Sequence, residues 1–209
     1  MREGKIIKVC GMTDAENIRA VEMLGVDLMG FIFYPRSPRF VDVRPAYLPE
    51  RARRVGVFVD ASFDEIMRRR DGFGLDYVQL HGSEEPELCS RLRDEGLLVI
   101  KAFGIGADGS RLPGGEYGET CDLFLFDTLT SAYGGSGTSF DWDVLDGYGG
   151  PLPFLLSGGI GPDSIVDAKT VDNKYFAGLD LNSRFEVTPG IKDVFLLSGF
   201  INGLFRQRL

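Results

Sequence analysis

Two residues that could exchange protons with a substrate stand at the ends of apolar segments. Cys10 ends the run 6–10, and Asp127 ends the run 123–127. A thiol and a carboxyl group placed on either side of a substrate can act as general base and general acid, and each proton transfer accelerates a reaction by roughly 10²–10⁴-fold. A free cysteine is equally common as a small buried hydrophobic residue, and Asp127 could instead cap the loop 128–131. Acid–base catalysis is therefore one hypothesis for this pair.

Three clusters of small and hydroxyl residues lie at the ends of the last three apolar runs or just after them, at 134–138, 157–159 and 182–183. Glycine lets the backbone approach an anion and point its N–H groups at it, and many barrels bind phosphate in loops at this place. Each cluster alone would be read as a turn. Together they predict a phosphate site, whose residues are Gly135, Ser136, Gly137, Gly158, Gly159, Asn182 and Ser183.

Three further residues are candidates for binding the substrate. Arg36 lies in a loop that two prolines stiffen, where a guanidinium could bind a carboxylate with two hydrogen bonds or form a surface ion pair. His81, the single histidine, ends the run 78–81 and could contact a ligand or tie its loop to a backbone carbonyl. Asp180 ends the last run. Asp60 and Lys101 also lie near run ends, and their roles stay open between ligand contact and an ion pair.

Eight apolar runs lead up to these residues. They are 6–10, 28–33, 55–60, 78–81, 99–103, 123–127, 154–158 and 175–180. Continuous apolar runs are typical of strands buried on both faces, and hence of a parallel sheet covered by helices. Eight such strands predict an α/β fold, a (β/α)8 TIM barrel that spans residues 1–209 as a single domain. The loops after the strands build the site of such a barrel, so the candidate residues should converge.

Helical signals lie between the runs. Thr13 or Asp14 is expected to cap a helix that ends before Gly25, and further helices are expected over 62–70, 83–96 with Ser83 as its cap, and 191–206. The segment 104–120 is rich in glycine and polar residues, and 162–169 has room for barely two turns. We therefore expect helices 5 and 7 of the barrel to be short or replaced by loop.

The composition argues against several classes of protein. The chain has 31 acidic and 23 basic residues and a net charge of −8, which argues against a nucleic-acid or anionic-membrane surface. Its three cysteines form neither a disulfide framework nor a metal-binding pattern, and they are expected to be reduced thiols of a cytoplasmic protein. No apolar signal segment or membrane span is evident, so we expect a soluble protein.

Several of these motifs resemble those of the phosphoribosylanthranilate isomerase family, in unbroken order from Lys8 to about Asp193. The matching segments are 8–12 (KVCGM), 30–33 (GFIF) with 37–39 (SPR), 57–59 (VFV), 78–82 (VQLHG), 126–128 (FDT), 135–137 (GSG) with 140–142 (FDW), 156–160 (LSGGI), 179–186 (LDLNSRFE) and 189–193 (PGIKD). The cysteine motif, together with the Asp-Thr and Gly-Ser-Gly segments, is the most specific part of the likeness.

The resemblance implies a (β/α)8 barrel that performs an Amadori rearrangement in tryptophan biosynthesis, without a metal or an organic cofactor. Its substrate would be N-(5-phosphoribosyl)anthranilate, a small molecule, and the protein would be a monomer or a homodimer. Carried over by motif, Cys10 would be the general base, Asp127 the general acid and Arg36 the ligand of the anthranilate carboxylate. Asp127 must start protonated, which burial against Phe124, Phe126 and the anthranilate ring could favour.

Other functions compete with this one. A histidine-pathway aminoaldose isomerase would pair two aspartates and carry twin phosphate sites, whereas the first run here ends in Cys10. Indoleglycerol-phosphate synthase would need catalytic lysines and a glutamate at strand ends, and only Lys101 is suitably placed. A non-catalytic phosphosugar-binding barrel would be expected to lack the acid or the base.

Overall fold

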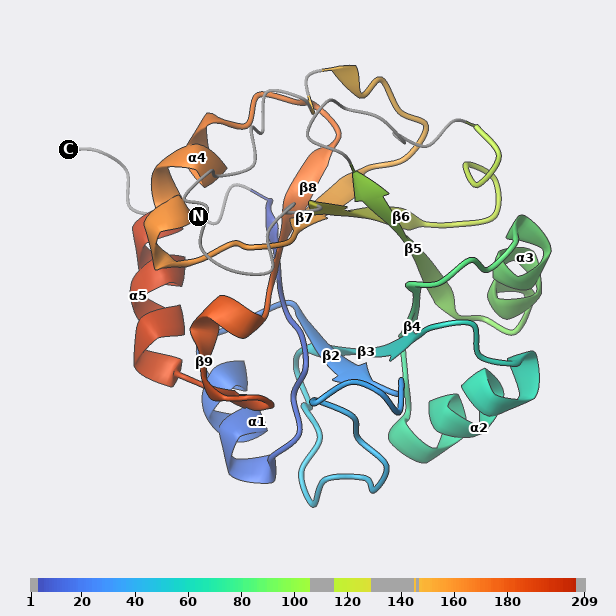
Figure 1. The fold of residues 1–209 in the computed structure, drawn as a ribbon, viewed down its shortest axis with the longest axis horizontal. Coiled ribbons are helices and arrows are strands. Elements are labelled where there is room, and N and C mark those ends of the chain that lie inside the picture. The colour runs from blue at the N-terminus through green and yellow to red at the C-terminus, as the bar shows by residue number, and fades with distance from the viewer. Residues whose placement is uncertain (1–3, 106–114, 129–144, 146, 206–209) are drawn as a thin grey trace.

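Eight parallel strands form a closed barrel, in which the last strand pairs with the first (Figure 1). The computed structural model describes residues 4–105, 115–128, 145 and 147–205. The strands are β1 (Ile6–Val9), β2 (Leu28–Ile32), β3 (Arg53–Phe58), β4 (Tyr77–Leu80), β5 (Leu98–Ile105), β6 (Leu123–Thr128), β7 (Phe154–Ser157) and β8 (Phe176–Leu181). The barrel predicted from the apolar runs is confirmed.

Helices surround the ring of strands (Figure 1). In the described part of the chain they are α1 (Ala15–Glu22), α2 (Phe63–Phe73), α3 (Pro86–Asp94), α4 (Ile165–Thr170) and α5 (Val194–Phe205). Asp14 caps α1 by accepting a hydrogen bond from the Asn17 N–H, and Ser62 caps α2 in the same way. Among these described helices, none has both the length and the apolar character needed to cross a membrane.

The strand side chains alternate between two buried layers. Ile7 and Val9 of β1 belong to the outer cluster, whereas Ile6 packs against the inner one. Successive residues of a strand point to opposite faces, so Lys8 and Cys10 share the inner side with Ile6. This alternation aims every second side chain of a strand, Lys8 and Cys10 among them, toward the barrel axis.

Helices 5 and 7 of the barrel were expected to be short or replaced by loop, and the described residues of both segments agree with this. The unit after β7 consists of one 3₁₀ turn, η2 (Pro162–Ser164), and the six-residue α4. After β5, residues 115–122 contain no helix, and residues 106–114 lie outside the described part. Residues 33–52, between β2 and β3, also contain no helix, although the expected barrel had only helices 5 and 7 short or replaced by loop.

Two predicted helix starts are wrong. The helix expected from Ser83 begins at Pro86, because the Glu84 carboxylate is buried and binds Lys101 and two backbone N–H groups instead of lying in a first turn. The helix expected from residue 191 begins at Val194, because β10 (Ile191–Lys192) pairs antiparallel with β9 (Glu186–Thr188). This short hairpin follows a 3₁₀ turn, η3 (Ser183–Phe185), at the end of β8.

Candidate active site

A cavity of about 200 Å³ opens at the carboxyl ends of the strands. Nearly every strand of the barrel contributes to its wall. The lining residues are Cys10, Ile32, Val57, Gln79, His81, Asp127, Ser157, Gly158, Gly159, Ile160, Asp180, Asn182 and Ser183. Eight of the twelve residues predicted for the site therefore lie together: both proposed catalytic residues and six of the proposed binding residues.

Cys10 lies just beyond β1, with its backbone N–H donating to the carbonyl of Leu181 on β8 (2.9 Å). The thiol packs against the backbone of β2, where a methyl group added to Gly30 would lie 2.6 Å from the sulfur. Cys10 is 3% exposed, and that exposure faces the cavity it lines. Burial raises the pKa of the thiol, whereas the Lys8 and Lys192 ammonium groups act to lower it.

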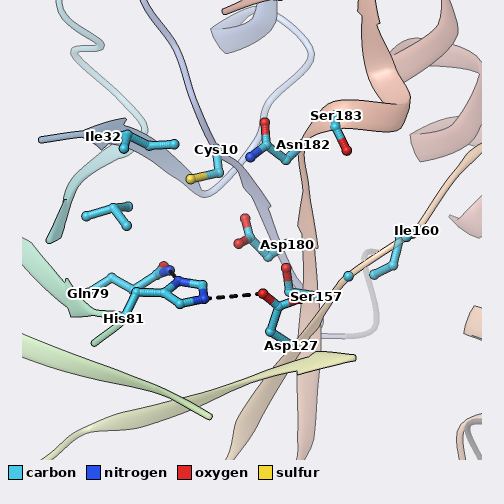
Figure 2. Close-up of a pocket in the computed structure, with 13 residues that line it drawn as sticks. Cys10, Ile32, Gln79, His81, Asp127, Ser157, Ile160, Asp180, Asn182 and Ser183 are labelled. Atoms are coloured by element: carbon cyan, nitrogen blue, oxygen red, sulfur yellow. Dashed lines mark hydrogen bonds and ion pairs between the residues drawn. The ribbon is translucent and has the colours of Figure 1, made fainter. Parts of the chain in front are cut away.

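Asp180 lies between the two proposed catalytic groups in Figure 2. Its Oδ1 accepts a hydrogen bond from Lys8 Nζ at 2.9 Å, and the two residues face each other in register on β8 and β1. Burial raises the pKa of the Asp180 carboxyl, and the Lys8 ammonium opposes that rise. Asp180, which lines the cavity, thus belongs to a buried ion pair with Lys8 inside the barrel.

Asp127 reaches the cavity from β6 and is held by His81 from β4 (Figure 2). The His81 Nε2 lies 3.2 Å from Oδ2 of Asp127, and the Gln79 side-chain N–H₂ donates to His81 Nδ1 at 3.0 Å. Because Nδ1 accepts, a neutral ring carries its proton on Nε2 and donates it to Asp127. His81 therefore orients the carboxyl group, and neither of the two roles considered for it from the sequence describes this contact.

The environment expected for Asp127 is wrong in one respect. Phe124 and Phe126 belong to the outer cluster, on the opposite side of β6 from the cavity, and the Asp127 side chain is 35% exposed. The alternation of side chains along β6 separates the two rings from the carboxyl group. The apolar run before Asp127 thus builds the outer layer of the barrel rather than a pocket around the acid.

Backbone from β7 and β8 forms the other wall of the cavity. Gly158 and Gly159 both adopt positive φ angles, 89° and 64°, which glycine tolerates without strain. Asn182 and Ser183 line the same cavity after β8. These four residues converge as the sequence predicted, whereas the predicted Gly135, Ser136 and Gly137 lie outside the described residues.

The loop after β2 presents two arginines with different surroundings. Arg36 is exposed and, among the described residues, its side chain has no hydrogen-bond or ion-pair partner and does not line the cavity. Arg39 instead binds Glu186 through Nε and through the terminal nitrogen. Lys192 Nζ also donates to Glu186 (2.6 Å) and to Asn182 Oδ1 (2.7 Å). This network joins the loop to the end of β8.

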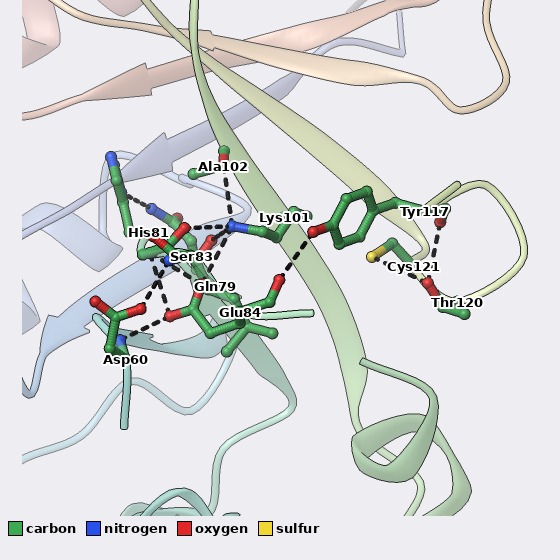
Figure 3. A network of polar contacts seen from close by, with 12 residues as sticks. Asp60, Gln79, His81, Ser83, Glu84, Lys101, Ala102, Tyr117, Thr120 and Cys121 are labelled. Carbon is green, nitrogen blue, oxygen red and sulfur yellow. Dashed lines mark hydrogen bonds and ion pairs between the residues drawn. The ribbon is translucent and has the colours of Figure 1, made fainter. Parts of the chain in front are cut away.

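Asp60 and Lys101 do not line this cavity and take part in polar contacts around the loop after β4 (Figure 3). Lys101 Nζ donates to Glu84 at 3.1 Å and to the carbonyl of Gly82 at 2.8 Å. The Asp60 carboxylate accepts the N–H of Ser83 at 2.7 Å. Both residues therefore stabilise the loop after β4, and the alternative of an ion pair is correct for Lys101.

Sequence reasoning missed two residues that support the site from within the barrel: Lys8, which binds Asp180, and Gln79, which binds His81. Both are fully buried polar side chains inside apolar strands, at 0% and 1% exposure. A lysine or glutamine that costs desolvation in the middle of a buried strand is a detectable signal, because such residues are retained only where they have partners. Among the described residues, no group of three potential ligands could hold a metal ion.

Comparisons with known proteins identify the family of the chain. Residues 7–203 match the family model described as N-(5'phosphoribosyl)anthranilate (PRA) isomerase. The chain is 50% identical over 199 residues to the N-(5'-phosphoribosyl)anthranilate isomerase of Phocaeicola vulgatus, covering 95% of this chain and 97% of the relative.

Two solved structures share the fold. One is a phosphoribosyl anthranilate isomerase in complex with reduced 1-(o-carboxyphenylamino)-1-deoxyribulose 5-phosphate, with a TM-score of 0.77, 32% identity, and 96% and 98% of the two chains covered. The other, from Thermotoga maritima, contains monomers generated from a dimeric phosphoribosylanthranilate isomerase, with a TM-score of 0.73, 31% identity and the same coverage. With its site geometry and these matches, the chain belongs to the N-(5'-phosphoribosyl)anthranilate isomerase family.

Proposed function

We propose that Cys10 is the general base and Asp127 the general acid of the isomerisation that this family performs. The reaction converts N-(5'-phosphoribosyl)anthranilate into 1-(2-carboxyphenylamino)-1-deoxyribulose 5-phosphate, in the biosynthesis of tryptophan. The observation that carries the proposal is the position of the two groups, which reach one cavity from β1 and β6 with Asp180 between them (Figure 2).

Two proton transfers suffice for this chemistry. Asp127 gives a proton to the furanose ring oxygen, and the ring opens to an iminium ion. The positive nitrogen acidifies the hydrogen on C2, which the Cys10 thiolate removes to give an enolamine. Tautomerisation of the enolamine yields the ketone. His81 donates to Oδ2 of Asp127, so the other carboxyl oxygen is free to hold the acid proton.

The remaining predicted residues bind different parts of the substrate. Gly158, Gly159, Asn182 and Ser183 offer backbone N–H groups and polar side chains to the phosphate. We place Gly135, Ser136 and Gly137 with them on the sequence pattern. Asp180 and His81 line the cavity where the sugar would lie. Arg36 is an exposed guanidinium that can bind the anthranilate carboxylate without breaking a side-chain hydrogen bond or ion pair to any residue the structure describes.

The proposal extends to the compartment, the partners and the oligomeric state of the enzyme. Three free cysteines, all buried, fit a reducing compartment, and we place the protein in the cytoplasm. Its partner is the small phosphoribosyl substrate, and we propose no nucleic-acid or membrane partner. The oligomeric state is a monomer or a homodimer, as for the related protein whose dimeric and monomeric forms are both known.

Turnover of the purified protein tests the proposal, followed by the loss of anthranilate fluorescence. We expect the parent to be active and Cys10→Ser and Asp127→Asn each to lower kcat by at least about 10²-fold, with cooperative unfolding retained. Gly72→Ala is a matched control, because nothing lies within 4 Å of the added methyl group on α2. Full activity of Cys10→Ser would mean that the thiol is only a buried hydrophobic residue.

A further inference from the structure

The interior of the barrel holds a lysine directly beneath the proposed base. Lys8 and Cys10 are two residues apart at β1, so their side chains leave the same face of the strand and point inward. Lys8 is fully buried, and its ammonium binds Asp180 Oδ1 at 2.9 Å. From this position the charge of the ammonium acts to lower the pKa of the Cys10 thiol.

Among the described residues, four charged groups act electrostatically on the Cys10 thiol, each from a different element. Lys8 comes from β1, Lys192 from β10 and Arg39 from the loop after β2, and Asp180 on β8 is the one anion among them. Arg39 and Lys192 share Glu186 as their counter-ion. Lys8 is the cation with the largest effect on the pKa of the thiol, and the hydrogen bond to Asp180 fixes where its ammonium lies.

The proposed reaction needs Cys10 as a thiolate, and these charges affect how much thiolate is present. Burial raises the pKa of the Cys10 thiol, so burial alone would leave too little thiolate to remove a proton from carbon. A buried positive charge beside the sulfur offsets that effect strongly, because water does not screen it. The pKa of Lys8 would be lowered by burial, but Asp180 and the thiol raise it above its ordinary value, so the lysine stays charged.

We propose that Lys8 is a positioning residue that stabilises the thiolate of Cys10 and makes this thiol an effective base. The inference rests on the role of Cys10 proposed above. Lys8 itself does not line the cavity, so it acts on the substrate only through other residues. Asp180 holds the charged ammonium of Lys8 in place beneath the thiol.

A purely structural role for Lys8 would be to fill the barrel and pair with Asp180. The chain offers a matched control for that role in Lys101, which is 3% exposed, lies on β5 and pairs with Glu84 (Figure 3). Lys101→Met removes an equally buried lysine and leaves an equally buried carboxylate. It should cost stability without changing the reactivity of Cys10.

The experiment measures alkylation of Cys10 by iodoacetamide as a function of pH, with the modified peptide quantified by mass spectrometry. This readout needs no catalytic activity. In Lys8→Met we expect the alkylation rate at pH 8 to fall at least about tenfold, equivalent to a pKa shift of one unit or more. The Lys101→Met protein should react like the parent. The pH profile of kcat/KM should move in the same direction as the alkylation profile.

A second variant covers the case in which Lys8→Met does not fold. Lys8→Met with Asp180→Asn removes both charges of the pair, which buried pairs tolerate better than the loss of one partner. It should fold and still be alkylated more slowly than the parent, because Lys8 affects the thiol more strongly than Asp180 does. Alkylation at the parental rate in either folded variant overturns the role of Lys8. The alkylation rates test the role of Lys8, whereas the turnover of Cys10→Ser tests the role of Cys10 as the base. Failure of this inference can therefore be distinguished from failure of the proposed function.

Discussion

The His81 ring and the Asp127 carboxyl group meet across the rim of the barrel, with Nε2 3.2 Å from Oδ2 although the residues are 46 positions apart. This contact fixes one oxygen of the proposed acid. We expect His81→Ala to lower kcat at least about tenfold, because a freely rotating acid is misplaced, with a smaller effect on KM. Steady-state kinetics check this. An unchanged kcat would mean that Asp127 is oriented without the histidine.

Gly30 leaves the space that the Cys10 sulfur occupies. A methyl group added at Gly30 would lie 2.6 Å from Sγ and 3.1 Å from the Cys10 Cα, closer than atoms in contact can approach. Gly30→Ala should therefore displace the thiol and lower kcat at least about tenfold, since a misplacement of about 1 Å can cost 10²-fold in rate. Gly72→Ala, in open space on α2, is the control and should keep parental activity. Parental kcat in Gly30→Ala would show that the thiol need not stay where it lies.

The two arginines of the loop after β2 should separate binding from stability. Arg36→Met should raise KM by roughly 10-fold or more with little change in kcat or in the unfolding midpoint, because Arg36 is exposed and has no side-chain partner among the described residues. Arg39→Met should lower the free energy of unfolding, because it leaves Glu186 with one cation fewer. Equal KM values for Arg36→Met and the parent would remove Arg36 from the binding site.

Glu186 should make stability depend on pH below about 5. Burial would raise its pKa, but hydrogen bonds from Arg39 and Lys192 hold the pKa at about 2. The unfolded chain binds this proton near pH 4.3, so the stabilisation is complete above that pH and is lost as the pH falls toward 2. It amounts to on the order of 3 kcal/mol.

Urea unfolding at pH 7 and pH 3 measures this effect. Glu186→Gln should be less stable than the parent at pH 7, and the difference between the two proteins should narrow at pH 3. A difference that stays constant over this range would mean that the carboxylate does not carry the effect. The comparison cancels contributions from other carboxyl groups, which both proteins share.

Much of the barrel could be predicted because its strands are buried on both faces and therefore form continuous apolar runs. Side chains that end these runs, such as Cys10, His81 and Asp127, could be assigned to one rim from topology alone. The hairpin of β9 and β10 could not be predicted, because its strands have three and two residues and depend on tertiary contacts rather than on a local pattern.

Contacts between distant residues set the limit of sequence reasoning at the site. The local sequence does not show that Arg39 forms an ion pair and Arg36 does not. The difference depends on Glu186, which binds Arg39 and lies 147 positions further along the chain. The Lys8 and Asp180 pair is likewise 172 positions apart, and only closure of the barrel brings the two together. The ionisation of Cys10 depends on that pair, so it could not be assessed before the fold was known.

A crystal structure with reduced 1-(o-carboxyphenylamino)-1-deoxyribulose 5-phosphate bound to this protein tests the central claim most directly. The account predicts the phosphate at Gly158, Gly159 and Ser183, with the Cys10 sulfur about 3.5 Å from C2 of the sugar. The Asp127 carboxyl should lie on the opposite side, within hydrogen-bond reach of the oxygen released from the ring. A bound analogue whose C2 faces away from the sulfur, or whose sugar oxygens do not approach Asp127, would contradict the assignment of base and acid.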